Sequence, residues 1–421
     1  MYNLLFSCLV EQVTPHCFIN KNSEKMKKNI RGVEVPARRV EGPGAWTASA
    51  ILSISLLTVM AGAAMAPALG AIKEHFASCS PLTVQLIVSL PALLIIVTTF
   101  FFRPLCRLMP TRTLALTGLT LYVVSGAGAF FVDGIGLLLV LRALLGVSVG
   151  MIMPLSTGLL SFYYPPEEQG RLMGLSAAMN QLGGVVATLL AGVLATVEWR
   201  YAFLVYLAGL LAIVLVAAKL PNERLATPGS RLELKTLLRF HPSVTAMLLI
   251  MLLFFVYPTN FALTSMEHGV DGITTTVVMM GLDVVAFLVG LVFGWLMHHL
   301  RRPMKYGAPL FFLLGYAALS FLPWGAGMLV GSALIGIANG VGVPYVNTIA
   351  SIKGGRDAAI TVMPLISAAL YLGQFLSPLV VSPIAAAIGT ANAPYIVAMC
   401  IAVVFLLQVY LTRRQHALPP A

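Results

Sequence analysis

The chain is a succession of long apolar stretches separated by short polar segments, from about residue 46 to residue 412. A helix needs about 20 mainly apolar residues to cross the hydrocarbon layer of a membrane. Twelve stretches are long enough, and we therefore predict an all-α membrane protein with twelve transmembrane helices. The predicted spans are residues 46–69, 82–102, 114–132, 136–161, 171–196, 200–218, 243–264, 273–297, 306–323, 327–349, 358–381 and 393–412.

The stretches form two related sets of six. At an offset of 190 or 191 residues, Pro67, Gly146, Gly150, Pro154 and Leu182-Gly183 match Pro258, Gly336, Gly340, Pro344 and Leu372-Gly373. We expect two pseudo-symmetric six-helix bundles, at 46–218 and 243–412, with a tail at 1–45, a linker at 219–242 and a tail at 413–421. Duplicated halves within a membrane are typical of secondary transporters, whose site lies between the halves.

Composition and charge set the class and the orientation. The chain is 59% hydrophobic and 10% charged, with a mean hydropathy of +0.92, whereas soluble domains carry about 25% charged residues. Of the Lys and Arg residues, Arg142 falls within a span, and only Lys73 and Arg200 fall in segments on one side of the membrane. All the others fall in segments on the opposite side. The positive-inside rule therefore places both termini, the linker and most of the net charge of +11 in the cytoplasm, facing lipid rather than nucleic acid.

Other functional classes lack support in the sequence. The five cysteines have no CxxC spacing, and no GxxxxGK[ST] loop is present, so no disulfide framework, metal site, cofactor or ATP hydrolysis is indicated. No nucleophile and base constellation suggests an enzyme. Met26 opens a second start-like sequence, MKKNIRGVEV, so we expect residues 1–25 to be absent from the native protein.

Three segments resemble the major facilitator superfamily. Residues 141–146, continuing to Gly150 and Pro154, are similar to the fourth-span motif of its proton-coupled members. Residues 164–171 resemble the loop between spans four and five, and residues 198–203 resemble the entry into span six, with Glu198 in place of a glycine. The resemblance implies a twelve-span transporter that works by alternating access.

Two family motifs are altered. The cytoplasmic loop pattern survives in the first half only as residues 103–112, and the second copy keeps Gly294, Leu296 and a basic end. In the family this loop helps to latch the halves in one state. Because Arg103 replaces its glycine and Arg107 its acid, we expect the latch to be built differently here, with Arg107, Arg112, Arg301 and Arg302 as gating or interface residues. The Gly-Pro pair of the family's antiporter motif is replaced by Ala187-Thr188.

Asp283, about ten residues into the eighth predicted span, is the only acid deep in any span. A carboxylate is costly in a low-dielectric environment, and intramembrane acids commonly take up and release protons. We predict that Asp283 is the proton-coupling group. The alternative is a structural role, in which Asp283 faces a neighbouring helix and only forms a hydrogen bond there.

Arg142 lies in the outer half of the fourth span, where the second copy has the neutral Ser332. An Arg could hold an anionic substrate group or favour ionisation of a nearby carboxyl group. It could equally be structural. The fourth and eighth spans belong to different halves, so we do not expect a direct pair between Arg142 and Asp283.

Amides and one tyrosine are the remaining candidates. Asn260, Asn339 and Asn347 lie near prolines in the seventh and tenth spans, which line the cavity in the family, and are candidates for substrate contact. Interhelical bonding is the alternative for each of them. Residues near the expected interface between halves, with a gating role, are Asn180, Gln181, Tyr371 and Gln374.

The function these features favour is proton-coupled efflux of a small amphiphilic organic molecule. A proton symporter that takes up an organic anion is the first alternative. A transport-inactive membrane sensor or assembly factor is the second. We expect a monomer in the inner membrane of a bacterium, with protons, a small-molecule substrate and lipid as its partners.

Overall fold

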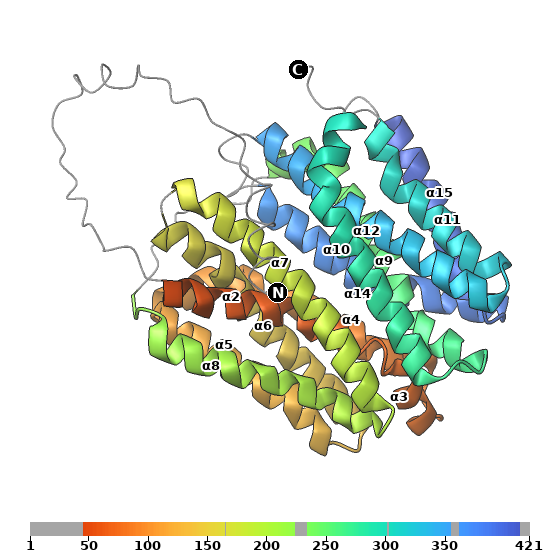
Figure 1. The fold of residues 1–421 in the computed structure, drawn as a ribbon, viewed down its shortest axis with the longest axis horizontal. Helices are drawn as coiled ribbons and strands as arrows, with labels where there is room; N and C mark the ends of the chain where they lie inside the picture. The colour runs from red at the N-terminus through yellow and green to blue at the C-terminus, as the bar shows by residue number, and fades with distance from the viewer. Residues whose placement is uncertain (1–44, 165, 224–233, 301–302, 355–361, 413–421) are drawn as a thin grey trace, which may run out of the picture. The chain divides into compact units, whose positions relative to one another are not determined.

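The computed structural model describes residues 45–164, 166–223, 234–300, 303–354 and 362–412. Within these ranges the chain is helical and contains no strand (Figure 1). The first half comprises α2 (Ala45–Ala63), α3 (Leu69–His75), α4 (Pro81–Leu108), α5 (Thr111–Ala127), η2 (Gly128–Phe131), α6 (Ile135–Tyr163), α7 (Pro166–Ala195), η3 (Trp199–Leu207) and α8 (Ala208–Lys219). The second comprises α9 (Leu234–Glu267), α10 (Gly272–His299), η4 (Pro303–Tyr306), α11 (Gly307–Phe321), α12 (Trp324–Gly354), α14 (Met363–Ile388) and α15 (Ala393–Leu411).

The twelve-helix architecture predicted from the sequence is confirmed. Eleven helical segments of the described residues are long and apolar enough to cross a membrane. The twelfth, α11, has 15 residues and follows η4. Two spans are not uniform: residues 64–68 separate α2 from α3, and the sixth span begins with the nine-residue 3₁₀ helix η3.

Boundaries differ from the prediction where local signals override hydropathy. Helix α9 begins at Leu234, within the expected linker. Helix α14 begins at Met363 and continues past Pro383 to Ile388, beyond the predicted end at residue 381, and residues 358–361 of the predicted span lie outside the described residues. It ends at Gly389, whose φ of 74° is the left-handed cap that glycine favours.

The two halves repeat the same packing. In the first half α4 packs on α6 and α2 on α7; in the second α10 packs on α12 and α9 on α14. Between the halves, α4 packs on α14 and α7 on α10. We call the end that carries the short connections 76–80, 132–134, 196–198, 268–271, 322–323 and 389–392 the distal end, and the opposite end the linker end.

Glycines at matched positions permit these contacts. A Cβ atom on Gly336 would lie 2.7 Å from the Leu282 carbonyl oxygen of α10, and one on Gly146 would lie 2.8 Å from Pro91 Cα of α4. Close helix approach through small residues, expected from the repeated Gly-x-x-x-Gly pattern, is therefore present in both halves.

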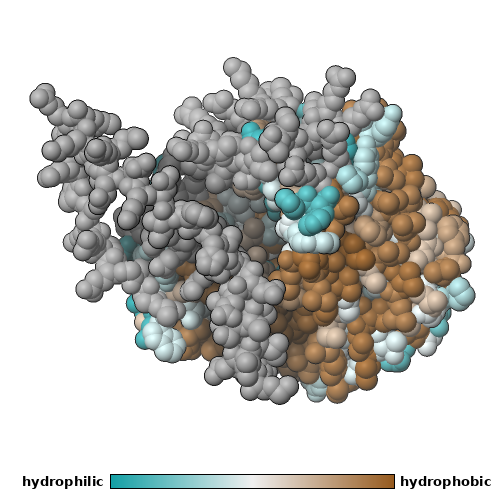
Figure 2. All heavy atoms as spheres, turned by 45° about the horizontal axis from the view of Figure 1, so that its top comes forward, coloured by the Kyte–Doolittle hydropathy of each residue, from teal (hydrophilic) through white to brown (hydrophobic). Residues whose placement is uncertain are grey.

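On the face that Figure 2 shows, the described residues that remain visible are mostly hydrophobic. Large side chains with more than half of their surface exposed include Phe131, Leu211, Trp295, Phe321 and Val404. Such a surface suits contact with lipid, and the chain is a multi-pass integral membrane protein.

Candidate functional site

Arg142, on α6, is completely buried inside the first half. Its Nη1 donates to the Tyr206 hydroxyl at 2.8 Å, and its guanidinium lies 5.2 Å from the ring of Phe203 and 4.8 Å from that of Tyr206. Nε and Nη2 have no hydrogen-bond acceptor among the described residues. A buried cation held only by aromatic rings and one hydroxyl is costly, so the position calls for a reason beyond packing.

Tyr206 connects Arg142 to the end of α2. Its hydroxyl donates to the Ala61 carbonyl oxygen at 3.0 Å. Ala61 belongs to the last turn of α2, where carbonyl groups lack helical partners and the helix dipole is negative. The end of α2 thereby offsets part of the charge of Arg142.

The second half contains the same framework without the cation. The Tyr122 hydroxyl donates to the Leu57 carbonyl at 3.2 Å, and the Tyr316 hydroxyl donates likewise to the Leu253 carbonyl. The ring centroids of Tyr122 and Tyr206 are 5.5 Å apart, and those of Tyr316 and Tyr395 are 6.0 Å apart. These contacts make Leu57 equivalent to Leu253, and hence Ala61 equivalent to Tyr257.

At these equivalent positions the two halves exchange side-chain size. In the first half Arg142 is large and Ala61 is small. In the second half Ser332 is small, and the Tyr257 hydroxyl fills the space and lies 2.6 Å from the Ser332 hydroxyl. The second half thus replaces a buried cation by a neutral hydrogen bond.

The break after α2 has a simple origin. Ala61 and Ser80 are 19 positions apart, whereas their equivalents Tyr257 and Asp271 are 14 apart. The first half therefore has five extra residues here, which matches the non-helical segment 64–68. Pro67 lies in this insertion, so its alignment with Pro258, which lies inside the continuous α9, is a correction to the sequence analysis.

Asp283 lies on α10 at the contact with α7 and is half-buried. Its Oδ2 accepts a hydrogen bond from the Thr188 hydroxyl of the first half at 3.0 Å. Towards the distal end the same two helices meet closely, because Gly192 lies directly against the Thr276 side chain. The acid therefore belongs to a seam between the halves, and no ion pair joins it to Arg142 among the described residues.

Asn260 also lies between the halves. It is buried, and its Oδ1 accepts from Gln85 Nε2 of α4 at 2.8 Å. Asn339 and Asn347, on α12, are half-buried, and Asn339 Oδ1 has no partner among the described residues.

The predicted interface residues divide into two groups. Tyr371 donates to Met153 Sδ across the halves at 2.8 Å, and the buried Gln374 lies beside Gly62 of α2. Asn180 instead accepts from Thr58 at 2.8 Å within the first half, and Gln181 is half-buried on the same helix.

Of the four arginines predicted to have gating roles in the basic loops, the structure describes two. Arg107 is exposed at the end of α4, and Arg112 donates to the Ala217 carbonyl oxygen inside the first half. Arg301 and Arg302 lie outside the described residues.

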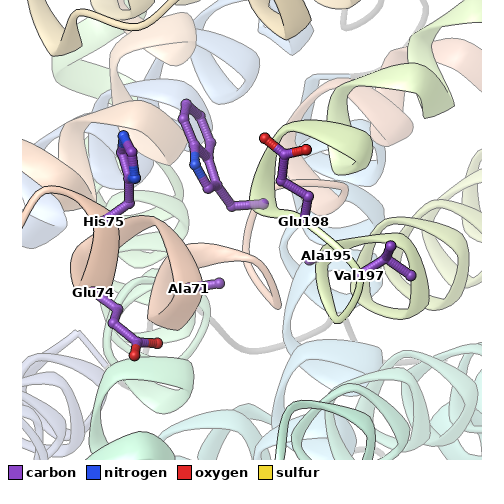
Figure 3. Close-up of a pocket in the computed structure, with 7 residues that line it drawn as sticks. Ala71, Glu74, His75, Ala195, Val197 and Glu198 are labelled. Carbon is purple, nitrogen blue, oxygen red and sulfur yellow. The ribbon is translucent and has the colours of Figure 1, made fainter.

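A surface hollow of about 310 Å³ lies at the distal end of the first half (Figure 3). It is lined by Ala71, Glu74, His75, Ala195, Val197, Glu198 and Trp199. The ring centroids of His75 and Trp199 are 5.0 Å apart, and Glu198 Oε1 lies 3.6 Å from Arg200 Nε. The hollow contains none of the residues predicted as a site. No group of three His, Cys, Asp or Glu side chains suited to a metal ion occurs in the described part of the chain.

Sequence reasoning missed the partners of the predicted residues. Gln85 is a polar residue in an otherwise apolar stretch, and it could have been selected on that ground. Thr188 stood out in the sequence only because Ala187-Thr188 replaces the Gly-Pro pair of the family's antiporter motif. Tyr206 gave no signal, because a tyrosine in a span usually lies at the membrane interface.

Comparisons with known proteins identify the family of the chain. The sequence profile of the Major Facilitator Superfamily matches residues 51–378. Sialin of Ovis aries is 38% identical over 82 residues, which cover 19% of this chain and 16% of sialin. Multidrug resistance protein B homolog of Mycobacterium tuberculosis (strain CDC 1551 / Oshkosh) is 31% identical over 116 residues, which cover 27% of this chain and 22% of that protein. The chain thus spans less than a quarter of the length of these relatives.

Solved structures agree with the fold. A bacterial homolog of the human lysosomal transporter Spinster, in an inward-facing and occupied conformation, has a TM-score of 0.73 at 16% identity, with 89% of this chain and 98% of that chain covered. The unoccupied inward-facing form has a TM-score of 0.71 at 16% identity, with 90% and 100% covered. The family is one of transporters rather than enzymes. The chain belongs to the major facilitator superfamily.

Proposed function

We propose that this protein exports a small amphiphilic organic molecule in exchange for protons, by alternating access. The observation that carries the proposal is the position of Asp283, the only acid deep in a span among the described residues, on the seam where α7 meets α10. A proton exchanged there acts directly on a contact between the halves. Relatives called multidrug resistance proteins support export.

The chemistry at the seam links protonation to conformation. An ionised Asp283 accepts the Thr188 hydroxyl in a charge-assisted hydrogen bond. A protonated Asp283 forms only a neutral bond and no longer pays the cost of a charge at this interface. The two protonation states therefore stabilise contact between the halves to different extents, which is the differential interaction that coupling requires.

The orientation is part of the proposal. The linker and most basic residues are cytoplasmic by the positive-inside rule, so the distal end faces outwards. The membrane would be the inner membrane of a bacterium.

Reconstituted vesicles with an imposed pH gradient test the coupling. We expect uptake of a lipophilic organic cation dye into inverted vesicles to follow the gradient in the wild type. Asp283→Asn keeps the shape and the Thr188 contact but removes titration, so transport should lose its dependence on the gradient. Glu267→Gln, which alters an exposed acid at the distal end of α9, is the matched control. An Asp283→Asn variant with unaltered gradient dependence would overturn the proposal.

Arg142 favours a second candidate, proton-driven uptake of an organic anion. Two of its nitrogens find no acceptor in the described part of the chain, and an anionic substrate group could supply one. This candidate requires the aromatic cover of Phe203 and Tyr206 to move, because Arg142 is fully buried in the state described. Accumulation of a metabolite anion together with alkalinisation of the medium would favour it over export.

A further inference from the structure

Three polar side chains from three helices meet near the distal end of the bundle. Gln85 is four residues into α4, Asn260 is seven residues from the end of α9, and Ser382 is six residues from the end of α14. The Ser382 hydroxyl donates to Gln85 Oε1, and Gln85 Nε2 donates to Asn260 Oδ1 at 2.8 Å. One amide of the first half therefore binds two helices of the second.

The network is buried at Gln85 and Asn260, half-buried at Ser382, and well satisfied. Gln85 and Asn260 are 2% and 5% exposed. Asn260 Nδ2 donates to the Val256 carbonyl at 2.9 Å and to the Thr259 hydroxyl at 3.1 Å, so that the whole amide is engaged and its orientation is fixed. Breaking the network while it is buried would leave unpaired polar groups, which is costly.

An amide that only stabilises the fold would bond within its own half, and Gln408 on α15 does so. Its Nε2 lies 3.1 Å from the Thr245 hydroxyl and 3.4 Å from the Pro242 carbonyl, both on α9. Both hydrogen bonds of the Gln85 amide instead cross the boundary between halves. Its bonds exist only while α4, α9 and α14 are together.

A backbone contact lies next to the network. A Cβ atom on Gly70 of α3 would lie 3.2 Å from the Ala262 carbonyl oxygen of α9, two residues beyond Asn260. The distal parts of α3, α4, α9 and α14 are thus in contact around Gln85.

We infer that Gln85 is the centre of a clasp, formed with Asn260 and Ser382, that holds the distal end closed and must release for substrate to pass on that side. The inference rests on the alternating access of the proposed function. It assigns Asn260 to the gate rather than to the substrate. Gln85 is a positioning residue, since it acts through the relative placement of the halves.

Spin-label distances across the distal end test the clasp. Labels are placed at Ser78 and Thr390, both exposed, in a chain whose five cysteines have been replaced. The measurement uses purified protein without substrate or pH gradient, so its outcome is independent of whether proton-coupled export is correct. Gln85→Met preserves length and removes both bonds. We expect the ratio of long to short distances to rise by roughly tenfold, as the loss of one buried and one half-buried hydrogen bond implies.

Two further variants decide between a clasp and a structural amide. Ser382→Ala removes one bond and should shift the ratio by roughly threefold. Combined with Gln85→Met it should add nothing, because both changes remove the same bond. Gln408→Leu, the control within one half, should leave the distances unchanged.

Unchanged distances in a folded Gln85→Met variant, or a shift of equal size in Gln408→Leu, would overturn the inference. If Gln85→Met does not fold, Ser382→Ala decides alone: a population of longer distances supports the clasp, and wild-type distances refute it.

Discussion

The two halves share one framework of tyrosines but differ in whether it encloses a buried cation. Each half places a tyrosine hydroxyl on a backbone carbonyl of its first helix and packs a second tyrosine ring nearby, edge-on in the first half and stacked in the second. The first half adds Arg142, whereas the second half fills the same space with Tyr257 and Ser332. Because the second half shows that a neutral solution fits the fold, the fold itself does not require the cation.

Asp283, the acid at the seam between α7 and α10, also distinguishes the two halves. Asp283 of α10 has Thr188 of α7 as its partner in the other half. The cation is buried inside the first half and the acid lies at its boundary with the second. Duplication supplied a symmetric scaffold, and the charged groups mark where the two copies diverged.

The largest effect is expected from forcing the second half to resemble the first. Ser332→Arg places a cation where Tyr257 already fills the space, at a cost of at least about 3 kcal/mol for an unpaired buried charge. We expect little monodisperse protein in size-exclusion chromatography. Adding Tyr257→Ala recreates the space found beside Ala61 and should recover folded protein. If Ser332→Arg alone folds normally, the size exchange has no energetic basis.

The reverse change tests whether the cation serves transport. Arg142→Met removes a buried charge, two of whose nitrogens have no partner among the residues that the structure describes, and keeps most of the volume, so the melting temperature should be unchanged or higher. If the cation serves transport, transport should fall by roughly 10- to 100-fold, because hydrogen bonds to a charged group contribute about 1.5 to 3 kcal/mol. A variant with a much lower melting temperature and normal transport would assign Arg142 to structure.

Matched glycines should give a smaller, paired effect. Gly146→Ala and Gly336→Ala each push a methyl group against backbone atoms, and overpacking of this kind costs about 1 to 3 kcal/mol. We expect both to lower the melting temperature, with the same sign in each half. Gly281→Ala is the control because no atom lies within 4 Å of the added group, and it should not lower the melting temperature. An effect in only one half would show that the repeats pack differently.

The smallest effect is expected at the matched helix caps Ser80 and Asp271. Ser80 accepts from the Thr83 backbone N–H at 3.2 Å, and Asp271 accepts from the Thr274 N–H at 2.8 Å and from its hydroxyl at 2.6 Å. The bonds from the Thr274 hydroxyl and N–H hold the pKa of Asp271 below its ordinary value. Its stabilisation is therefore present above the unfolded pKa and is lost as the pH falls through the folded one.

Thermal melts at two pH values check the caps. Asp271→Ala should lower the melting temperature near neutral pH, and the loss should shrink in acid. Ser80→Ala should lower it by about 1 to 3 °C at either pH. Equal pH dependence for the two variants would contradict the assignment.

Much of the fold followed from the sequence because its signals are local. Twelve apolar stretches and repeated glycines sufficed for two bundles with close helix contacts. The break at 64–68 did not follow, because all of its residues are apolar or small and hydropathy continues through it. Only the spacing between Ala61 and Ser80, compared with that of the second half, shows the insertion.

The site was predictable in its charged members but not in their partners. Asp283 and Arg142 stand out because charges are rare in spans. Gln85, Thr188 and Ser382 are uncharged, and their importance comes from contacts between residues 95 to 297 positions apart. Such contacts depend on how the halves meet, which no local pattern encodes. The assignments of Asn339 and Asn347 to substrate contact stay predictions.

The unusual winding of η3 has a consequence for Arg142. A 3₁₀ helix rises about 2.0 Å per residue and an α-helix about 1.5 Å, so rewinding nine residues would draw the segment in by about 4 to 5 Å and rotate it like a screw. Phe203 and Tyr206 both lie on this segment. Such a turn would displace both rings from the guanidinium even if α6, which carries Arg142, stayed in place.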